Sequence, residues 1–249
     1  MPALHDMHCH LDFMTNGEEV AGAAQAAGTL IFANTVEPNG YAAACGRFGA
    51  FGSVRIGLGL HPWWVDAESP DRQLEVFEGL LPQTHFVGEV GLDFGRRGAA
   101  TRDVQVAAFT RIAQLCAKAG GKLLSLHAVR SAETVLDILE HTGALANCTC
   151  IFHWFSDTSV QLLRARRAGC FFSVHPMMAS TGRGREYIKA IEPDRLLLEA
   201  DAPPEQGMAY SYDELRSQLQ KASDAIAASR GESALETIAR TSEQLLGRG

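Results

Sequence analysis

Two histidines separated by a single residue, His8 and His10, lie in residues 4–13, where the sequence LHDMHCHLDF mixes three histidines and two aspartates with apolar residues. In a β-strand, side chains at positions i and i+2 point to the same face, so both imidazoles would face one way. Imidazoles and carboxylates without partners are costly to bury in an apolar core. The stretch therefore indicates a pair of metal ligands.

Further imidazoles and carboxylates stand at the ends of other predicted strands or within them. They are His61, Glu89, His127, His153 and Asp201. Neutral imidazole with carboxylate suits zinc, manganese or iron, and carboxylate oxygens also accept magnesium. A structural zinc ion uses four ligands in a closed tetrahedron, and the candidate ligands here are too many for one such site. Two divalent ions (Mg, Mn or Zn) that share a bridging carboxylate fit the set better, with open positions for water and substrate.

In this interpretation Glu89 bridges the two ions. One ion is held by His8, His10 and Asp201, and the other by His127 and His153. Asp201 also acts as the general base for a water molecule that attacks phosphorus or a carbonyl carbon, while the ions neutralise the developing charge. Glu89 and Asp201 are therefore the predicted catalytic residues. Glu199 either orients a ligand from behind or lies exposed on the surface.

Short β-rich runs alternate with amphipathic stretches along the whole chain. The predicted strands cover residues 4–10, 29–35, 53–60, 85–91, 122–127, 148–153, 170–174 and 195–200. They are apolar and bounded by glycine or polar residues, as is typical of buried parallel strands. The clearest predicted helices cover residues 101–119, 132–140, 213–228 and 233–246. In the first of them, apolar residues recur every three or four positions and Gly120–Gly121 ends the pattern.

Eight such strands within 249 residues match the size of an α/β protein of the (β/α)8 TIM-barrel type. No linker divides the chain, so we predict one domain over residues 1–249, with loops at residues 95–100 and 180–186. An open doubly wound sheet is the alternative, but no GxGxxG motif follows the first strand. In barrels of this type the active site lies at the carboxyl ends of the strands, where the candidate ligands stand.

The overall charge and the cysteines restrict the function further. The net charge is −7 and the pI is about 5.7, unlike the basic footprint of a protein that binds nucleic acid through its own charge. A nuclease remains possible if metal ions supply positive charge. No apolar run suits a membrane span and no signal peptide is recognisable, so we expect a cytoplasmic protein. The six cysteines form no CxxC pair and are expected to be reduced thiols, most of which pack in the core.

Six motifs in order along the chain carry a family resemblance. They read DMHCHLDF, GLHPWW, VGEVGLDF, LHAVRS, HWFSD and LLEADAPP. Together they resemble the TatD family of metal-dependent deoxyribonucleases, within the amidohydrolase-type barrels. The resemblance implies a (β/α)8 barrel and a divalent-metal nuclease that typically digests DNA from 3′ to 5′. It gives a substrate-side role to His61. The metal-ligand roles that it implies fall on His8, His10, Glu89, His127, His153 and Asp201.

The wording of several motifs is similar to one subgroup, QatD of the Qat anti-phage defence system, which implies partner proteins from that system. Other positions depart from the family. The loop after Asp201 reads APP, and the usual Arg-Asn-Glu-Pro run beyond it is missing. Arg130 stands one residue later than the family arginine, so its role in binding phosphate is left open. His175 is interpreted either as part of the site or as a surface residue.

Several further residues are candidates for substrate contact. Trp63 and Trp64 follow His61, where aromatic rings either stack on nucleobases or pack onto the rim of the barrel. Arg96, Arg97 and Arg183 either meet phosphates or remain solvated. We interpret Asp12 and Asp93 as organisers of loops and hydrogen bonds. His5, His85 and His141 are expected to be structural or surface residues.

Three functions remain to be separated. The first is a metal-dependent DNA exonuclease, which the HWFS and GEVGLD motifs favour. The second is a two-metal hydrolase of an ester, amide or lactone, which the acidic charge and the altered loop favour. The third is a binding protein that has lost turnover, against which the complete ligand set argues. We predict the first.

Overall fold

The eight predicted strands are all present in the computed structural model, which describes residues 2–247. The strands are β1 (Asp6–Cys9), β2 (Ile31–Asn34), β3 (Val54–Leu60), β4 (Phe86–Asp93), β5 (Leu123–Val129), β6 (Thr149–His153), β7 (Phe171–Val174) and β8 (Leu196–Leu198). They follow one another in a single sheet in chain order, from β1 to β8. The pairs β1–β2, β3–β4, β4–β5, β5–β6 and β7–β8 are parallel.

Helices separate the strands along the chain. They are α1 (Gly17–Ala26), α2 (Pro38–Phe48), α3 (Pro70–Leu80), α4 (Arg102–Ala119), α5 (Ala132–Thr142), α6 (Ala144–Asn147), α7 (Ser159–Arg167), α8 (Pro176–Ser180), α9 (Gly182–Ala190), α10 (Tyr212–Arg230) and α11 (Ser233–Leu246). The four helices predicted from periodicity correspond to α4, α5, α10 and α11, with bounds that agree within two residues. No helix among the described residues is long and apolar enough to cross a membrane.

One predicted loop is wrong. Residues 180–186 were expected to be irregular because they are rich in glycine and charge, yet α9 begins within them. Thr181 is the reason, because its hydroxyl accepts a hydrogen bond from the backbone N–H of Gly184 and so caps the helix. A side chain at Gly184 would collide with the carbonyl oxygen of Met178. This glycine of α9 therefore permits a close approach to the backbone of α8.

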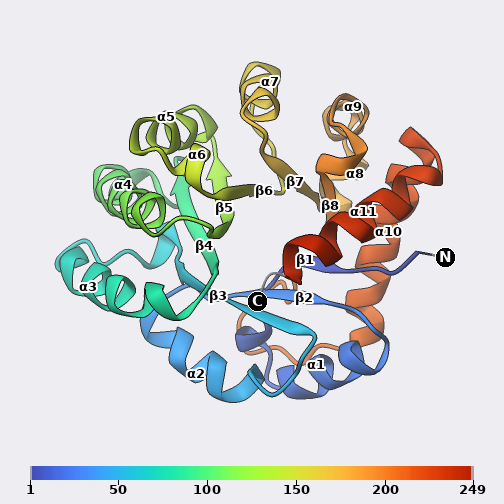
Figure 1. Cartoon of the computed structure of the whole chain (residues 1–249), viewed down its shortest axis with the longest axis horizontal. Coiled ribbons are helices and arrows are strands. Elements are labelled where there is room, and N and C mark those ends of the chain that lie inside the picture. The colour runs from blue at the N-terminus through green and yellow to red at the C-terminus, as the bar shows by residue number, and fades with distance from the viewer. Residues whose placement is uncertain (1, 248–249) are drawn as a thin grey trace. The chain divides into compact units, whose positions relative to one another are not determined.

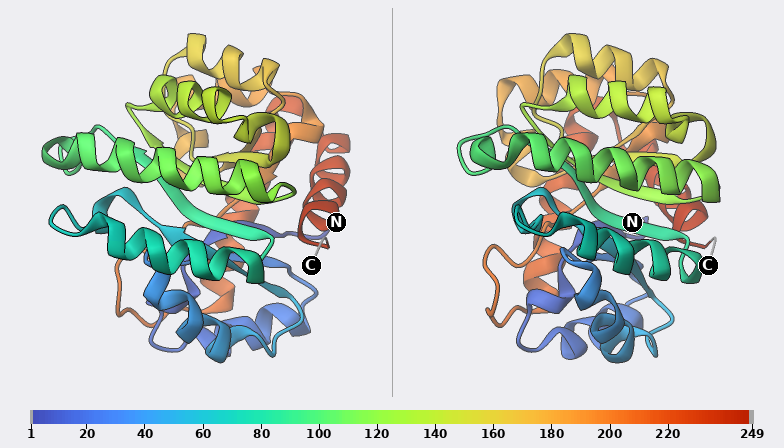
Figure 2. Two further views of the ribbon diagram at one scale, coloured as in Figure 1. Left: turned by 60° about the vertical axis from the view of Figure 1, so that its left-hand side comes forward. Right: turned by 90° about the vertical axis from the view of Figure 1, so that its left-hand side faces the viewer.

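The chain divides into two compact units. The first unit comprises Met1–Ala33, Ala44–Ile56 and Phe171–Gly249, and the second comprises Asn34–Ala43 and Gly57–Cys170. In the second unit α3, α4 and α5 lie side by side, with α4 against β4 (Figures 1 and 2). In the first unit α10 packs against α8, α9 and α11 (Figure 1).

Apolar residues fill the strands, as the sequence predicts. Every residue of β1 and of β4 is buried, although both strands carry candidate ligands. In β1, Met7 and Cys9 alternate with Asp6 and His8, so polar and apolar side chains take opposite faces. Gly91 of β4 has a φ of +143° and faces His127, whose backbone a side chain there would strike. A glycine is thus required where β4 passes the imidazole-bearing part of β5.

The cysteines behave as packing residues. Cys9, Cys116, Cys150 and Cys170 are buried, whereas Cys148 is partly exposed. Burial raises the pKa of the Cys116 thiol to about 12, so this group stays neutral at physiological pH. The Cys148 thiol donates a hydrogen bond to the backbone oxygen of Cys116 over 3.4 Å. These contacts agree with the predicted role in the core.

Candidate metal centre

Two strands of the second unit bring imidazoles to a carboxylate oxygen on a third strand. Glu89 lies within β4, His127 within β5 and His153 at the end of β6. The Nδ1 atom of His127 lies 2.6 Å from Glu89 Oε1, and the Nε2 atom of His153 lies 2.9 Å from the same oxygen. All three side chains are buried. Because β5 runs two residues past His127, this histidine lies inside its strand and not at the predicted end.

The spacing of these atoms suits a shared cation. The Nδ1 atom of His127 and the Nε2 atom of His153 are 3.2 Å apart. Two nitrogen ligands about 2.1 Å from a tetrahedral zinc ion lie roughly 3.4 Å from each other. A neutral imidazole carries one N–H and one lone pair, so only some of these atoms can satisfy each other by hydrogen bonds. A divalent ion would accept the remaining lone pairs and offset the buried charge of Glu89.

Asp93, at the end of β4, fixes the orientation of His127. Its Oδ2 atom accepts hydrogen bonds from the Nε2 atom of His127 over 3.3 Å and from the indole N–H of Trp63 over 2.6 Å. A proton on Nε2 leaves the Nδ1 lone pair directed at Glu89, which is how a second carboxylate prepares a histidine to bind metal. Burial disfavours the charged imidazole, but Glu89 and Asp93 outweigh it and raise the pKa of His127. The prediction that Asp93 organises hydrogen bonds is thus confirmed.

His61 lies beside this group as a hydrogen-bond donor. It directly follows β3, and its Nε2 atom lies 3.3 Å from Glu89 Oε1 and 3.3 Å from the Nδ1 atom of His127. By distance alone, His61, Glu89 and His127 could hold an ion together. However, His61 Nδ1 accepts a hydrogen bond from the backbone N–H of Trp63, so the neutral ring carries its proton on Nε2. That proton makes His61 unsuited to bind metal and suited to donate to an oxygen.

The first unit contains a second group, formed by His8, His10 and Asp201. The two imidazole Nε2 atoms are 3.3 Å apart, which confirms that both rings face the same way. Asp201 Oδ1 lies 3.7 Å from the Nε2 atom of His8 and 3.5 Å from that of His10. The backbone connects the three residues, because Asp201 N–H donates to the carbonyl of His8, and His10 N–H donates to that of Ala202. These three side chains could also hold an ion.

Buried carboxyl groups support this second group from behind. Asp6 Oδ1 accepts hydrogen bonds from the backbone N–H groups of His8 and Ala200. Burial raises the pKa of Asp6 well above its usual value, and the nearby Glu199 and Asp201 carboxyls add to the effect. Glu199 is fully buried and hydrogen-bonded to the hydroxyl of Ser173, which decides against the exposed position that was one of its two interpretations. Asp201 has a φ of +46°, and its side chain is 24% exposed.

The remaining candidates lie in several places. Trp63 is 38% exposed, and the guanidinium of Arg97 lies over its ring at 3.8 Å. Arg130 is exposed, with a φ of +54°, directly before Ser131 and α5. His175 is buried, where it accepts a hydrogen bond from Met177 N–H to cap α8 and contacts the carbonyl of Ala200. The surface interpretation of His175 is therefore wrong, and its contacts are structural.

Two residues with a role near these groups were not singled out from the sequence. Asp6 holds the backbone of β1 against the segment after β8, and its parity with His8 was the available signal. Arg102 at the start of α4 lies over the ring of Phe94 at 3.9 Å. Nothing in the sequence distinguishes Arg102 from an ordinary solvated arginine at a helix terminus.

Parallel strands in chain order that carry imidazole–carboxylate groups within them or just beyond them are typical of metal-binding hydrolases. Residues 5–246 match the family model "TatD related DNase", and the chain belongs to this family. It is accordingly a hydrolase of the deoxyribonuclease type, as predicted.

Individual relatives agree with this assignment. Human "Deoxyribonuclease TATDN3" is 27% identical over 221 residues, which cover 80% of this chain and 78% of that protein. A protein of Musicola paradisiaca named "3'-5' ssDNA/RNA exonuclease TatD" is 33% identical over 164 residues, covering 62% of this chain and 59% of that one. The crystal structure of YJJV, a TatD homologue from Escherichia coli, matches with a TM-score of 0.82 at 22% identity, covering 99% and 98% of the two chains. This likeness confirms the single-domain (β/α)8 barrel.

Proposed function

We propose that this protein is a divalent-metal-dependent deoxyribonuclease that removes nucleotides from the 3′ end of DNA. The observation that carries the proposal is the convergence of His127 Nδ1 and His153 Nε2 on one oxygen of Glu89, with Asp93 holding the far side of His127. Membership of the TatD-related DNase family supports DNA as the substrate. The 3′-to-5′ polarity is supported by the name of the Musicola relative.

The proposal includes a two-metal centre. The active site of a (β/α)8 barrel is built at the carboxyl ends of all its strands. On that basis we assign both imidazole–carboxylate groups to one centre, whose side chains would hold the ions. The ligands of this centre are His8, His10, Glu89, His127, His153 and Asp201. The mixed nitrogen and oxygen set suits Mg, Mn or Zn.

The chain's own side chains have separate tasks in hydrolysis. Two bound ions would supply a low-pKa water and offset the charge of the phosphate. Asp201, the most exposed of the ligand carboxylates, accepts the proton of the attacking water. His61 donates a hydrogen bond from Nε2 to a phosphate oxygen, a role consistent with the hydrogen bond that its Nδ1 accepts. Trp63 and Arg130 contact the strand, through stacking and through charge respectively.

A second candidate function is hydrolysis of an ester, amide or lactone by the same centre. The observations that favour it are the net charge of −7 and the altered loop after Asp201. An acidic surface lowers the local concentration of a polyanionic strand, so this protein relies on its site for attraction.

Digestion of end-labelled DNA tests the proposal directly. The protein is stripped of metal, supplied in turn with Mg, Mn or Zn, and incubated with single- and double-stranded DNA. We expect a ladder that shortens from the 3′ end and disappears with EDTA and with Glu89→Gln. Glu78→Gln is the matched control, because Glu78 is exposed and forms an ion pair with the exposed Arg111. Ester or amide turnover without cleavage of DNA by any metal form would replace the first function by the second.

The biological setting is a separate part of the proposal. The motifs similar to QatD support a role in cytoplasmic anti-phage defence, beside other proteins of the Qat system. Phage plating on cells that carry the complete system tests this role. We expect Glu89→Gln to restore plating to the level of cells without the system and Glu78→Gln to leave protection intact. Full protection with Glu89→Gln would contradict it.

A further inference from the structure

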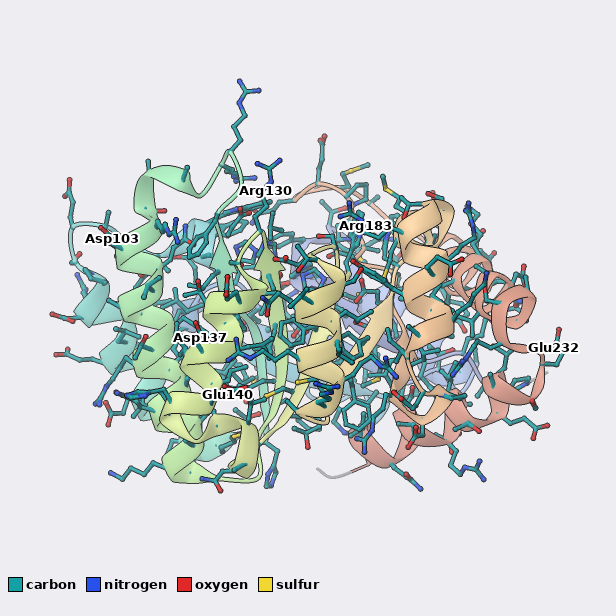
Figure 3. All side chains as sticks on the ribbon, turned by 90° about the horizontal axis from the view of Figure 1, so that it is seen from above. Asp103, Arg130, Asp137, Glu140, Arg183 and Glu232 are labelled. Atoms are coloured by element: carbon teal, nitrogen blue, oxygen red, sulfur yellow. The ribbon has the colours of Figure 1, made fainter. Side chains whose placement is uncertain are left out.

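A small pocket of the second unit lies where α5 and α7 begin. Its volume is about 360 Å³, which is within the range of small-ligand sites. The loops that form it follow β4, β5 and β6, the strands that carry Glu89, His127 and His153. Its lining includes Phe94, Arg102, Arg130, Glu133 and Asp157. Figure 3 shows Arg130 next to the first turn of α5, with Asp137 and Glu140 on later turns of that helix.

Arg102 and Arg130 form no ion pair with a carboxylate of the described residues, whereas several other arginines of the chain do. Arg47 is bound to Glu18, Arg111 to Glu78, and Arg164 to Asp137 and Glu140. Among the residues that the structure describes, neither Arg102 nor Arg130 pairs with a carboxylate. They lack such a partner although the pocket also contains two acidic side chains, Glu133 and Asp157. Their N–H groups remain available to an anion.

Asp157, one of the two carboxylates of the pocket, accepts hydrogen bonds from the backbone. Asp157 Oδ2 accepts a hydrogen bond from Ala132 N–H over 3.1 Å, and its Oδ1 accepts one from Thr158 N–H over 2.7 Å. These bonds fix the loop after β6 to the start of α5 and occupy both oxygens of Asp157. Asp157 remains an anion, so the pocket contains two acidic and two basic side chains, and the two backbone N–H groups offset only part of the charge of Asp157.

Stacking holds Arg102 in place. Its guanidinium lies 3.9 Å above the ring of Phe94, the residue that follows Asp93. A stacked guanidinium keeps its edge N–H groups free, and these groups match the oxygens of a phosphate. A similar arrangement recurs nearby, where Arg97 lies 3.8 Å above Trp63, whose indole is hydrogen-bonded to Asp93. Two arginines that follow Asp93 in the chain are thus held over aromatic rings.

We propose that this pocket binds a backbone phosphate of the DNA strand, next to the phosphate that is cleaved, through Arg102 and Arg130. The proposal rests on the nuclease function proposed above and extends it to a second subsite. Contacts with phosphate carry no sequence information, so the subsite would increase affinity for any strand without selecting bases. It would also explain how a chain with a net charge of −7 holds a polyanion.

Binding of a labelled single-stranded oligonucleotide, followed by fluorescence anisotropy in EDTA, tests the subsite without cleavage. We expect Arg102→Gln with Arg130→Gln to weaken binding about tenfold at low salt. Loss of this one bound phosphate should reduce the slope of log affinity against log salt by roughly 0.7. Glu133→Gln should tighten binding severalfold. Arg111→Gln is the control, because Arg111 lies on α4 like Arg102 but is paired with Glu78.

Each outcome separates the subsite from the nuclease function. An equal loss of affinity in Arg111→Gln would overturn the subsite, because it would show only an effect of total charge. Unchanged binding in both single variants, which serve if the double variant unfolds, would overturn it as well. If the wild-type protein binds the strand with the expected arginine dependence but cuts no DNA with any metal, the nuclease function fails and the subsite stands.

Discussion

The two imidazole–carboxylate groups differ in how firmly their ligands are held. In the second unit, the Glu89 oxygen lies within 2.6 to 2.9 Å of two imidazole nitrogens, and Asp93 and Trp63 fix His127 from behind. In the first unit, Asp201 lies 3.5 to 3.7 Å from the imidazoles of His10 and His8 and is partly exposed. The comparison suggests a tight site in the second unit. The group in the first unit has longer distances between carboxylate and imidazole, and its carboxylate is partly exposed to solvent.

Glu89→Gln should have the largest effect, because it removes charge from the centre of the tight group. A neutral amide leaves the lone pairs of His127 and His153 without their anionic partner. We expect metal bound per chain to fall, and DNA cleavage to fall by roughly a thousandfold. Metal analysis after gel filtration and single-turnover digestion measure the two losses. Full retention of metal would show that the imidazoles suffice and would weaken the comparison.

Asp201→Asn should separate proton transfer from metal binding. Because its carboxylate is the more loosely held one, we expect the tight group to keep its ion. Loss of a general base should lower the rate of cleavage by about a hundredfold. Metal analysis and the pH profile of cleavage distinguish the effects. A normal rate with loss of all metal would reverse the roles that we assign to the two groups.

Asp93→Asn should loosen the tight group without removing a ligand. An amide can present its N–H₂ to His127 and so favour the wrong tautomer. Loss of such a supporting carboxylate typically costs ten- to a hundredfold in metal affinity. Competition with a chelator measures the affinity. Asp103→Asn is the control, because Asp103 is exposed on α4, as Figure 3 shows. Equal affinity in both variants would mean that Asp93 only shapes its loop.

The sequence was sufficient for the strands and for naming the residues that the structure brings together in two groups, but not for most of the contacts around them. Period-2 spacing placed His8 and His10 on one face, and apolar runs marked all eight strands. The roles of Asp93, His61 and Arg102 depend on contacts between residues distant in sequence, such as Asp93 with Trp63. Composition also misled at residues 180–186, where a glycine-rich segment begins a helix because Thr181 caps it. That His61 carries its proton on Nε2 could be inferred only from the hydrogen bond that its Nδ1 accepts from Trp63 N–H.

The smallest effect is expected from breaking the ion pair between Arg47 and Glu18, near the His8–His10–Asp201 group. Arg47 forms a salt bridge with Glu18 and also donates to the carbonyls of Asp12 and Met14, which follow the His8–His10 pair. This arginine lowers the pKa of Glu18 to about 2. The lowered pKa means that the ion pair stabilises the folded protein above the ordinary glutamate pKa and is lost as the pH falls towards 2. Because the pair is exposed, Glu18→Gln should reduce the free energy of unfolding by less than about 1 kcal/mol near neutral pH. Urea unfolding at several pH values should show the difference from wild type shrinking on acidification, and a constant difference would assign the effect to packing instead of charge.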